Sequence, residues 1–342
     1  MSDSKKFNVA VLGATGTVGE AMISILEERL FPVLKLYPLA SHRSAGETVL
    51  FKKKSYLVED VEQFDFSKVQ IALFSAGSKI SAIYAEKAAE AGCIVIDNTS
   101  YFRQMDDVPL VITEVNSEDI AEFRNRGIIA NPNCSTMQML VALKPLYDAV
   151  GITRINVATY QSVSGSGKAA INELVTQVSD LLSGRPIESV VYPKQIAFNV
   201  LPQIDDFLDN GYTREEMKMF WETQKIFKDP DIQVNATAVR VPVFYGHSMA
   251  IHLETARKIS ANDAKEILSE APGVIVMDEN QSGGYPTPIP EASGTDAVYV
   301  GRIREDISYP LGLNLWVVSD NIRKGAALNA VQIAEILVSD YL

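Results

Sequence analysis

The segment "NPNCST" (131–136) places a cysteine between an apolar run, "GIIA", and a long periodic stretch, "MQMLVALKPLYDAV". This pattern predicts a strand followed by a helix, with Cys134 at the helix N-terminus. The helix dipole and the free N–H groups of a first turn favour a thiolate over a thiol. Cys134 is therefore a candidate nucleophile, although most free cysteines are small buried apolar residues. Cys93, in "GCIVIDN", fits that second description well.

A thiol nucleophile needs a base, and the chain has three histidines. His247, in "VFYGHSMA", follows a glycine between two extended stretches, where an imidazole can reach a cleft. His252 lies in the middle of a predicted strand and suits a structural role, and His42 lies close behind the second predicted strand. His247 is thus the candidate base, and its spacing alone leaves a structural role open.

A glycine-rich turn, "GATGTVG", places Gly13, Gly16 and Gly19 between a predicted strand and a predicted helix. Glycines allow the backbone to approach a pyrophosphate, and the helix N-terminus then faces the anion. Three spaced glycines alone are weak evidence, but their place at the start of an alternating strand and helix pattern favours dinucleotide binding over a merely structural turn. A second string, "SVSGSGKAA", is not a triphosphate-binding loop, because Ser162 and Ala169 replace a required glycine and a required hydroxyl.

The pattern of strands and helices changes along the chain, which predicts an α/β protein with two parts. The first third alternates strands (7–13, 34–41, 69–77, 93–100) with helices (18–30, 78–92), which predicts a doubly wound parallel sheet. After Cys134, a long strand (152–165), a helix (168–184) and a long extended stretch (233–256) predict an α+β domain with an antiparallel or mixed sheet. An insertion (201–233) contains one helix, and a closing helix covers 321–342.

Composition sets broad limits on function. A chain of 342 residues predicts about two domains, and a net charge of -12 argues against an extended nucleic-acid surface. The N-terminus, "MSDSKKFNVAVLG", reads as a strand and not a signal peptide, and no apolar run is long enough for a membrane span. Two cysteines give no metal-type spacing, so we expect no metal and a reducing cytoplasmic location.

Six segments occur in an order that resembles the aspartate-semialdehyde dehydrogenases: "GATGTVG", "SHRSAG", "NPNCSTMQM", "TYQSVSGSGK", "RVPVFYGH" and "DNIRKGAALNA". The resemblance covers the chain from about residue 7 to the C-terminus. It implies a Rossmann NADP-binding domain (1–132), a glyceraldehyde-3-phosphate-dehydrogenase-like catalytic and dimerisation domain (133–320), and a C-terminal helix (321–342) that returns to the first domain. A homodimer or a tetramer is implied as well.

The implied reaction is the NADPH-dependent reduction of L-aspartyl 4-phosphate to L-aspartate 4-semialdehyde and phosphate. It serves lysine, methionine, threonine and diaminopimelate biosynthesis. The resemblance makes Cys134 the nucleophile, His247 the general acid/base and Gln161 the residue that orients the reacting group. Substrate binding is implied for Arg240 (carboxylate), Glu215 (amino group), Lys218 and Arg103 (phosphate) and Asn133 (near the phosphate). Cofactor binding is implied for Gly13, Thr15, Gly16, Thr17, Val18, Gly19, Ser41, Arg43, Ser44, Ser164, Gly165 and Asn321.

The cofactor preference also follows from the residues themselves. NAD-specific folds of this kind carry an acidic residue at the end of the second strand, where it accepts a hydrogen bond from the ribose. Here "LKLYPLAS" is followed by "HRSAG", with no acid before Glu47. Ser41, Arg43 and Ser44 instead offer a guanidinium and hydroxyl donors, which suit a 2′-phosphate. NADP is therefore expected, unless this is simply a serine-rich surface loop.

Three other functions were weighed. N-acetyl-γ-glutamyl-phosphate reductase shares the general layout, but its cysteine block usually resembles "NPGCYPT", which "NPNCST" does not match. A catalytically silent paralogue acting as a binding protein would lack the cysteine or the histidine, and both Cys134 and His247 are present. A thiol hydrolase would not need the glycine turn.

Overall fold

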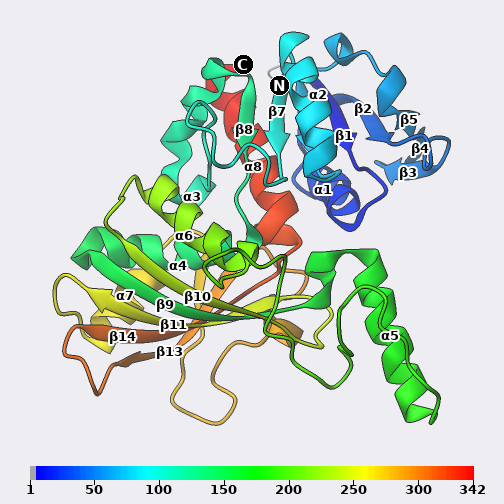
Figure 1. Cartoon of the computed structure of the whole chain (residues 1–342). Helices are drawn as coiled ribbons and strands as arrows, with labels where there is room; N and C mark the ends of the chain where they lie inside the picture. The colour runs from blue at the N-terminus through cyan, green and yellow to red at the C-terminus, as the bar shows by residue number, and fades with distance from the viewer. Residues whose placement is uncertain (1–4) are drawn as a thin grey trace. The chain divides into compact units, whose positions relative to one another are not determined.

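The structure is a computed structural model that describes residues 5–342, and its contacts divide the chain into two compact units (Figure 1). The chain leaves the first unit after Asn133, and the second unit is Cys134–Gly325. The last segment, Ala326–Leu342, belongs again to the first unit. No helix among residues 5–342 is long and apolar enough to span a membrane.

The first unit is built on a six-stranded sheet in the order β5-β2-β1-β6-β7-β8, with every neighbouring pair parallel. Its strands are β1 (Phe7–Leu12), β2 (Val33–Ala40), β5 (Glu59–Asp60), β6 (Ile71–Phe74), β7 (Ile94–Asp97) and β8 (Ile128–Ala130). Its helices are α1 (Thr17–Glu28), α2 (Ser78–Glu90), α3 (Thr113–Asn116) and α8 (Leu328–Ile336), and a hairpin adds β3 (Thr48–Phe51) and β4 (Lys54–Leu57). The predicted doubly wound parallel sheet is confirmed.

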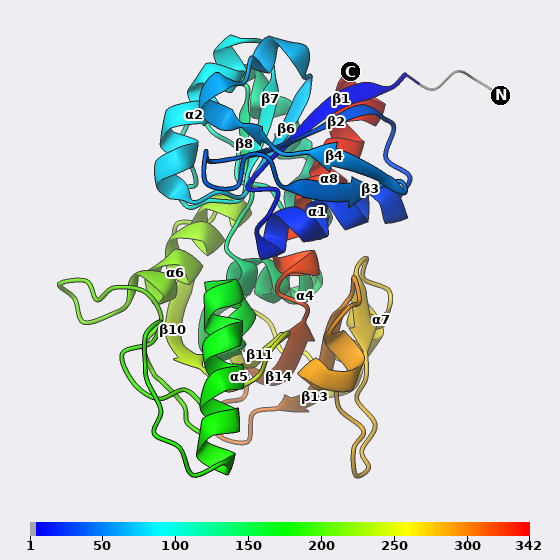
Figure 2. The ribbon, with the colours of Figure 1, turned by 90° about the vertical axis from the view of Figure 1, so that its right-hand side faces the viewer.

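Apolar residues explain why the C-terminal segment belongs to this unit. Strand β1 is buried along almost its whole length, as expected for a central parallel strand. Helix α8 contacts both α1 and β7, and it buries Leu328 and Val331 in the same core as Met22 and Leu26 of α1 (Figure 2). The predicted closing helix is shorter than expected, because regular α-helix covers only Leu328–Ile336 and wider π-type turns flank it.

The second unit contains a mixed six-stranded sheet in the order β10-β9-β11-β14-β13-β12. The two outermost pairs, β10/β9 and β12/β13, are parallel, and the inner pairs are antiparallel. The strands are β9 (Ile152–Gln161), β10 (Gln233–Arg240), β11 (His247–Thr255), β12 (Val274–Val276), β13 (Val298–Glu305) and β14 (Gly312–Ser319). The helices are α4 (Cys134–Val150), α5 (Lys168–Leu182), α6 (Arg214–Phe227) and α7 (Ala261–Ser269). The predicted α+β architecture with a mixed sheet is thereby confirmed.

Two predicted strands of this unit are too long. The extended stretch 233–256 forms two separate strands, because β10 ends at Arg240 and β11 begins at His247. These strands are not neighbours in the sheet, since β9 lies between them. Strand β9 ends at Gln161 instead of continuing to residue 165, and a short 3-10 helix, Val163–Ser166, follows it. Both breaks bring polar side chains to the same end of the sheet.

Candidate active site

Cys134 is the first residue of α4, as the sequence pattern predicts, and its side chain is partly exposed. The first turn of a helix presents N–H groups without intrahelical acceptors, and these can stabilise a thiolate or a nearby oxyanion. Cys93 differs in every respect that matters for reactivity. It is 1% exposed, and burial raises the pKa of its thiol. Cys134 is therefore the cysteine with the surroundings of a nucleophile.

The first turn of α4 faces the start of β11. Gln138 lies four residues after Cys134, so both residues are on the same face of the helix. The side-chain amide of Gln138 donates to the backbone carbonyl of His247, with 3.4 Å between nitrogen and oxygen. On another side of the thiol, a Cβ added at Gly325 would lie 2.8 Å from the Cβ of Cys134. The first turn of α4, which begins at Cys134, is thus packed against the backbone at His247.

His247 begins β11 and is completely buried. Its Nδ1 is 3.1 Å from the backbone nitrogen of Ser162, which donates a hydrogen bond to it. Its Nε2 has no hydrogen-bond partner among residues 5–342. Burial in the first place, and the charge of Arg240 in the second, hold the pKa of His247 well below its ordinary value. The ring is therefore neutral in this environment at neutral pH.

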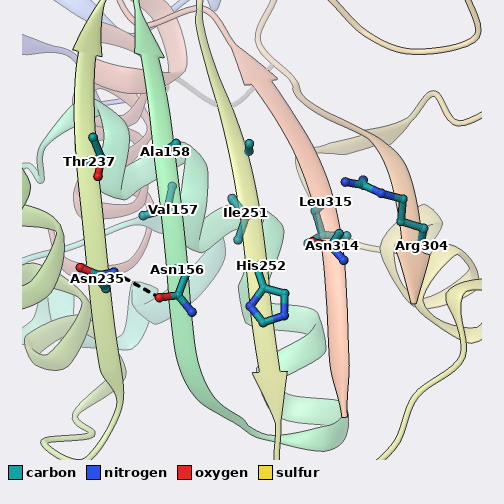
Figure 3. Close-up of a pocket in the computed structure, with 11 residues that line it drawn as sticks. Asn156, Val157, Ala158, Asn235, Thr237, Ile251, His252, Arg304, Asn314 and Leu315 are labelled. Carbon is teal, nitrogen blue, oxygen red and sulfur yellow. Dashed lines mark hydrogen bonds between the residues drawn. The ribbon is translucent and has the colours of Figure 1, made fainter. Parts of the chain in front are cut away.

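His252 lies on the opposite face of the sheet. It lies five positions after His247 in the same strand, and side chains alternate along a strand. Figure 3 shows His252 in a partly exposed pocket on that face, together with Asn156 and Asn235. Its Nε2 is 2.7 Å from the carboxylate of Asp306. The structural role predicted for His252 agrees with this hydrogen bond.

Asn321 connects the histidine to the residues that follow β9. Its Oδ1 accepts from the backbone N–H of Gly246, at 2.9 Å, and from the hydroxyls of Ser162 and Ser164, at 3.0 and 3.2 Å. Because a backbone N–H can only donate, the Gly246 contact fixes which side-chain atom of Asn321 is the oxygen. The family resemblance implies cofactor binding for Asn321 and Ser164, whereas nothing in the sequence points to Ser162 as a site residue. The structure shows all three in the network behind His247.

Arg240 is the last residue of β10 and pairs in register with Gln161 of β9. It is 4% exposed, and its Nη1 donates to the backbone carbonyl of Ser162 at 2.7 Å. Its Nε has no partner among the described residues, 5–342. The guanidinium also lies over the ring of Tyr192, 5.9 Å from the centroid. Arg240 is thus a buried cation that retains a donor for an anionic ligand.

A polar chain continues from Gln161 to α6. The amide nitrogen of Gln161 donates to a carboxylate oxygen of Glu215 at 3.1 Å, and Lys218 donates to the other oxygen at 3.2 Å. Lys218 also pairs with Asp205 at 2.8 Å, a contact that the sequence did not suggest. The structure therefore brings together six predicted residues of the second unit: Cys134, Gln161, Glu215, Lys218, Arg240 and His247.

Gly165 lies directly against this cluster. A Cβ added there would be 3.1 Å from Nη1 of Arg240 and 3.4 Å from Cε1 and Nε2 of His247. We expect Gly165→Ala to lower kcat/KM about ten-fold or more, because the methyl group would crowd the open edge of the imidazole. Steady-state kinetics measure the change in activity, and thermal unfolding measures any change in stability. A variant with unchanged kinetics, or one that loses activity only in proportion to its unfolding, would contradict the assignment.

In the first unit, the glycine turn has the close packing that a dinucleotide site needs. Gly13 has a φ of +87°, and a Cβ at Gly19 would lie 2.1 Å from the carbonyl oxygen of Gly13. Gly16 precedes α1, and its N–H donates to the same carbonyl at 3.0 Å. Thr15 lies in the turn, and Thr17 and Val18 open the helix. These contacts fit a backbone that receives a pyrophosphate.

The remaining predicted residues of the first unit lie in loops. Strand β2 ends at Ala40, and Ser41 and Arg43 are exposed in the turn that follows, beside the half-buried Ser44. Arg103 and Asn133 are both buried, and Nη2 of Arg103 donates to the carbonyl of Asn98 at 2.7 Å. Their roles toward a substrate stay predictions.

Comparison with known proteins agrees with this arrangement. Residues 8–123 match the family model "Semialdehyde dehydrogenase, NAD binding domain", and residues 143–324 match "Semialdehyde dehydrogenase, dimerisation domain". The chain is 68% identical to an aspartate-semialdehyde dehydrogenase of Shewanella violacea over 99% of both chains.

Two solved structures extend the comparison. The aspartate-semialdehyde dehydrogenase II of Vibrio cholerae, complexed with ASA, superposes with a TM-score of 0.97 at 61% identity, over 99% of this chain and 100% of the other. The Candida albicans enzyme, solved with NADP, gives a TM-score of 0.76 at 26% identity, over 97% and 98%. With its cysteine at the start of α4 and both family domains matched, the chain belongs to the aspartate-semialdehyde dehydrogenase family.

Proposed function

We propose that this protein catalyses the NADPH-dependent reduction of L-aspartyl 4-phosphate to L-aspartate 4-semialdehyde and phosphate. The observation that carries the proposal is that the helix beginning with Cys134 contacts the backbone of His247 in its first turn, while His247 and the buried Arg240 both bond to Ser162. The names of the relatives support it, and so does the Vibrio cholerae enzyme crystallised with ASA.

The chemistry follows from these residue types. The thiolate of Cys134 attacks the acyl carbon, a C–S bond forms, and the bond to the phosphate oxygen breaks, which leaves a thioester. NADPH, which the glycine turn would hold, would supply the hydride that reduces this thioester. The resulting thiohemiacetal oxygen needs hydrogen-bond donors, and His247 Nε2 and the first turn of α4 would supply them. Cleavage of the C–S bond then releases the aldehyde.

Substrate recognition would use the charged groups around Gln161. Arg240 would hold the α-carboxylate, because a planar guanidinium matches a carboxylate in two parallel hydrogen bonds. Glu215 would receive the amino group, and its present bond to Gln161 keeps its carboxylate beside the amide that orients the reacting group. Within the second unit, Lys218 would bind the phosphate.

The direct test is the reverse reaction. Purified protein is mixed with aspartate semialdehyde, NADP and inorganic phosphate, and NADPH formation is followed by absorbance. Formation that requires phosphate supports acyl-phosphate chemistry. NADPH formation without phosphate would indicate a simple aldehyde dehydrogenase, and absence of reaction with bound cofactor would indicate a catalytically silent paralogue.

The preference for NADP over NAD gives a separate prediction. Because Ser41 and Arg43 are exposed directly after β2 and no acid precedes Glu47, we expect the wild type to favour NADP. Arg43→Ala should remove most of that preference, by about ten-fold or more in the ratio of specificity constants, since a charge-assisted contact to the 2′-phosphate is lost. Lys54→Ala, in the nearby hairpin, is a charge-matched control that should leave the ratio unchanged. Equal use of NAD by the wild type would refute the argument.

Assembly and location complete the proposal. The second unit matches a dimerisation domain, and we expect a homodimer, with a tetramer as the alternative. Partly exposed side chains on the sheet face of Figure 3 offer a surface for a second copy. Cytoplasmic location stays the expectation from the sequence.

A further inference from the structure

An irregular segment of the second unit, residues 184–201, connects α5 to the strand that ends at Arg240. Its last residue is bonded to that strand. The backbone N–H of Leu201 donates to the carbonyl of Arg240 at 2.9 Å, and the N–H of Arg240 donates to the carbonyl of Leu201 at 2.8 Å. The segment therefore ends directly beside the buried arginine of the candidate site.

Two buried side chains of α5 hold the middle of this segment. The carboxylate of Glu173 and the side-chain oxygen of Gln177 accept from backbone N–H groups of the segment, which are those of Val190, Val191, Tyr192, Ile196 and Ala197. Buried backbone N–H groups need acceptors, and in this irregular segment a helix provides them instead of a sheet. The segment is thus fixed at α5 and at Arg240 before any ligand arrives.

Tyr192 is the aromatic residue that this segment places next to Arg240. Its ring centroid is 5.9 Å from the guanidinium carbon, and the residue is 8% exposed. The ring packs in an apolar cluster that also contains Val163, Leu174 and Ile196. A phenylalanine would fill the same space without burying a hydroxyl, so packing alone does not explain the tyrosine.

The buried hydroxyl of Tyr192 is a donor that a ligand can use. It makes no hydrogen bond of regular geometry with residues 5–342. Burial raises the pKa of the phenol, which therefore stays protonated at neutral pH. The charge of Arg240 and the side chain of Ser166 act on this pKa in the other direction, as a group that donates to the phenol oxygen does. A contact of that kind leaves the phenol proton for another acceptor.

Tyr192 is one of three residues beside the 3-10 helix Val163–Ser166 in which a buried polar atom has no partner within the described chain, 5–342. The other two atoms are Nε of Arg240 and Nε2 of His247. Gly165 contacts both of these side chains, since a Cβ added there would lie 3.1 Å from Nη1 of Arg240 and 3.4 Å from Nε2 of His247. Buried polar atoms are rarely left without partners, so three in one place indicate a space that a polar ligand completes.

We propose that Tyr192 is a substrate-binding residue, whose hydroxyl donates a hydrogen bond to the α-carboxylate that Arg240 holds. This inference rests on the proposed function and adds a specificity-determining residue to it. A carboxylate has about four lone-pair positions, and a guanidinium fork occupies two of them, so a neutral donor beside the fork serves a further position. Glu173 and Gln177 are then positioning residues, because they hold the segment that carries Tyr192.

The first experiment removes only the hydroxyl. Tyr192→Phe keeps the ring beside Arg240, and we expect it to raise the KM for aspartate semialdehyde about ten-fold, because a hydrogen bond to a charged group is lost. The KM for inorganic phosphate, measured in the same reverse reaction, should stay unchanged. Tyr309→Phe, at an exposed position between β13 and β14, is the matched control. An unchanged KM for the aldehyde, or an equal rise for both substrates, would overturn the proposal.

A double-mutant cycle identifies the substrate group that the hydroxyl contacts. In the Arg240→Lys background, where the carboxylate is already held poorly, Tyr192→Phe should raise the KM for aspartate semialdehyde much less than in the wild type. Independent effects that multiply would mean that the hydroxyl contacts another part of the substrate. Glu173→Gln gives the corresponding check on positioning. It should raise this KM in the wild type and have little effect in Tyr192→Phe, and equal effects in both would contradict the positioning role.

A binding measurement separates this inference from the proposed function. Aspartate semialdehyde is titrated calorimetrically into the full chain without NADP or phosphate, and Tyr192→Phe should bind it about ten-fold more weakly than the wild type and Tyr309→Phe do. If the wild type shows no phosphate-dependent activity but this difference in affinity is found, the proposed function fails and the role of Tyr192 stands. If the wild type is active and Tyr192→Phe binds the aldehyde with unchanged affinity, the role of Tyr192 is refuted and the proposed function stands.

Discussion

Replacement of Cys134 by serine is expected to abolish activity while the fold is kept. A hydroxyl is hardly ionised at neutral pH, so kcat/KM should fall by about a thousand-fold or more, as for removal of a catalytic nucleophile. The substitution is nearly isosteric, and the close approach of Gly325 to the Cβ is unchanged. Steady-state rates test the loss of activity, and circular dichroism with thermal unfolding tests whether the fold is kept. Retention of more than about a tenth of the wild-type rate would contradict a nucleophilic role.

Cys93→Ser is the matched control. Because Cys93 is 1% exposed in the first unit, its replacement can lower stability but should leave kcat/KM almost unchanged at a temperature where the protein is folded. Alkylation gives an independent readout. Iodoacetamide should modify Cys134 and spare Cys93, whose buried thiol has a raised pKa. If modification of Cys93 parallels the loss of activity, Cys93 is the essential thiol, and the assignment of Cys134 as the nucleophile is wrong.

Local signals explain which parts of the site could be predicted from sequence. The start of α4 at Cys134 follows from an apolar run, a proline and cap-forming residues, all within a few positions. The glycine turn lies between β1 and α1 for the same reason, since its strand, turn and helix are contiguous. The end of β2 at Ala40 is likewise visible in the residues that follow it.

The network behind His247 could not be predicted in this way. Ser162 and His247 are 85 residues apart, and Ser162 and Asn321 are 159 apart. They meet because β9, β11 and β14 are neighbours in that order, which periodicity along the chain does not reveal. The same holds for Gly165. That this position has no room for a side chain becomes clear only when Arg240 and His247 are seen beside it.

Arg240→Lys is the second substitution for which we expect a large effect, this time on substrate binding. The guanidinium is 4% exposed, and its Nη1 is held by the carbonyl of Ser162, so its plane is fixed before a ligand arrives. An ammonium cannot form two parallel bonds to a carboxylate and would also lose the contact with Tyr192. Loss of a hydrogen bond to a charged group costs about 1.5–3 kcal/mol. The KM for aspartate semialdehyde should therefore rise roughly ten- to hundred-fold.

The contact with Ser162 means that a change at Arg240 can also reach His247, so KM and kcat must be measured separately. A rise in KM with a smaller fall in kcat supports carboxylate binding, whereas a fall in kcat alone would mean that Arg240 only supports the imidazole. Arg154→Lys, at an exposed position of β9, is the matched control and should change neither constant. An unchanged KM in Arg240→Lys would remove this arginine from the substrate site, and the buried cation would then be explained only by its bond to the carbonyl of Ser162.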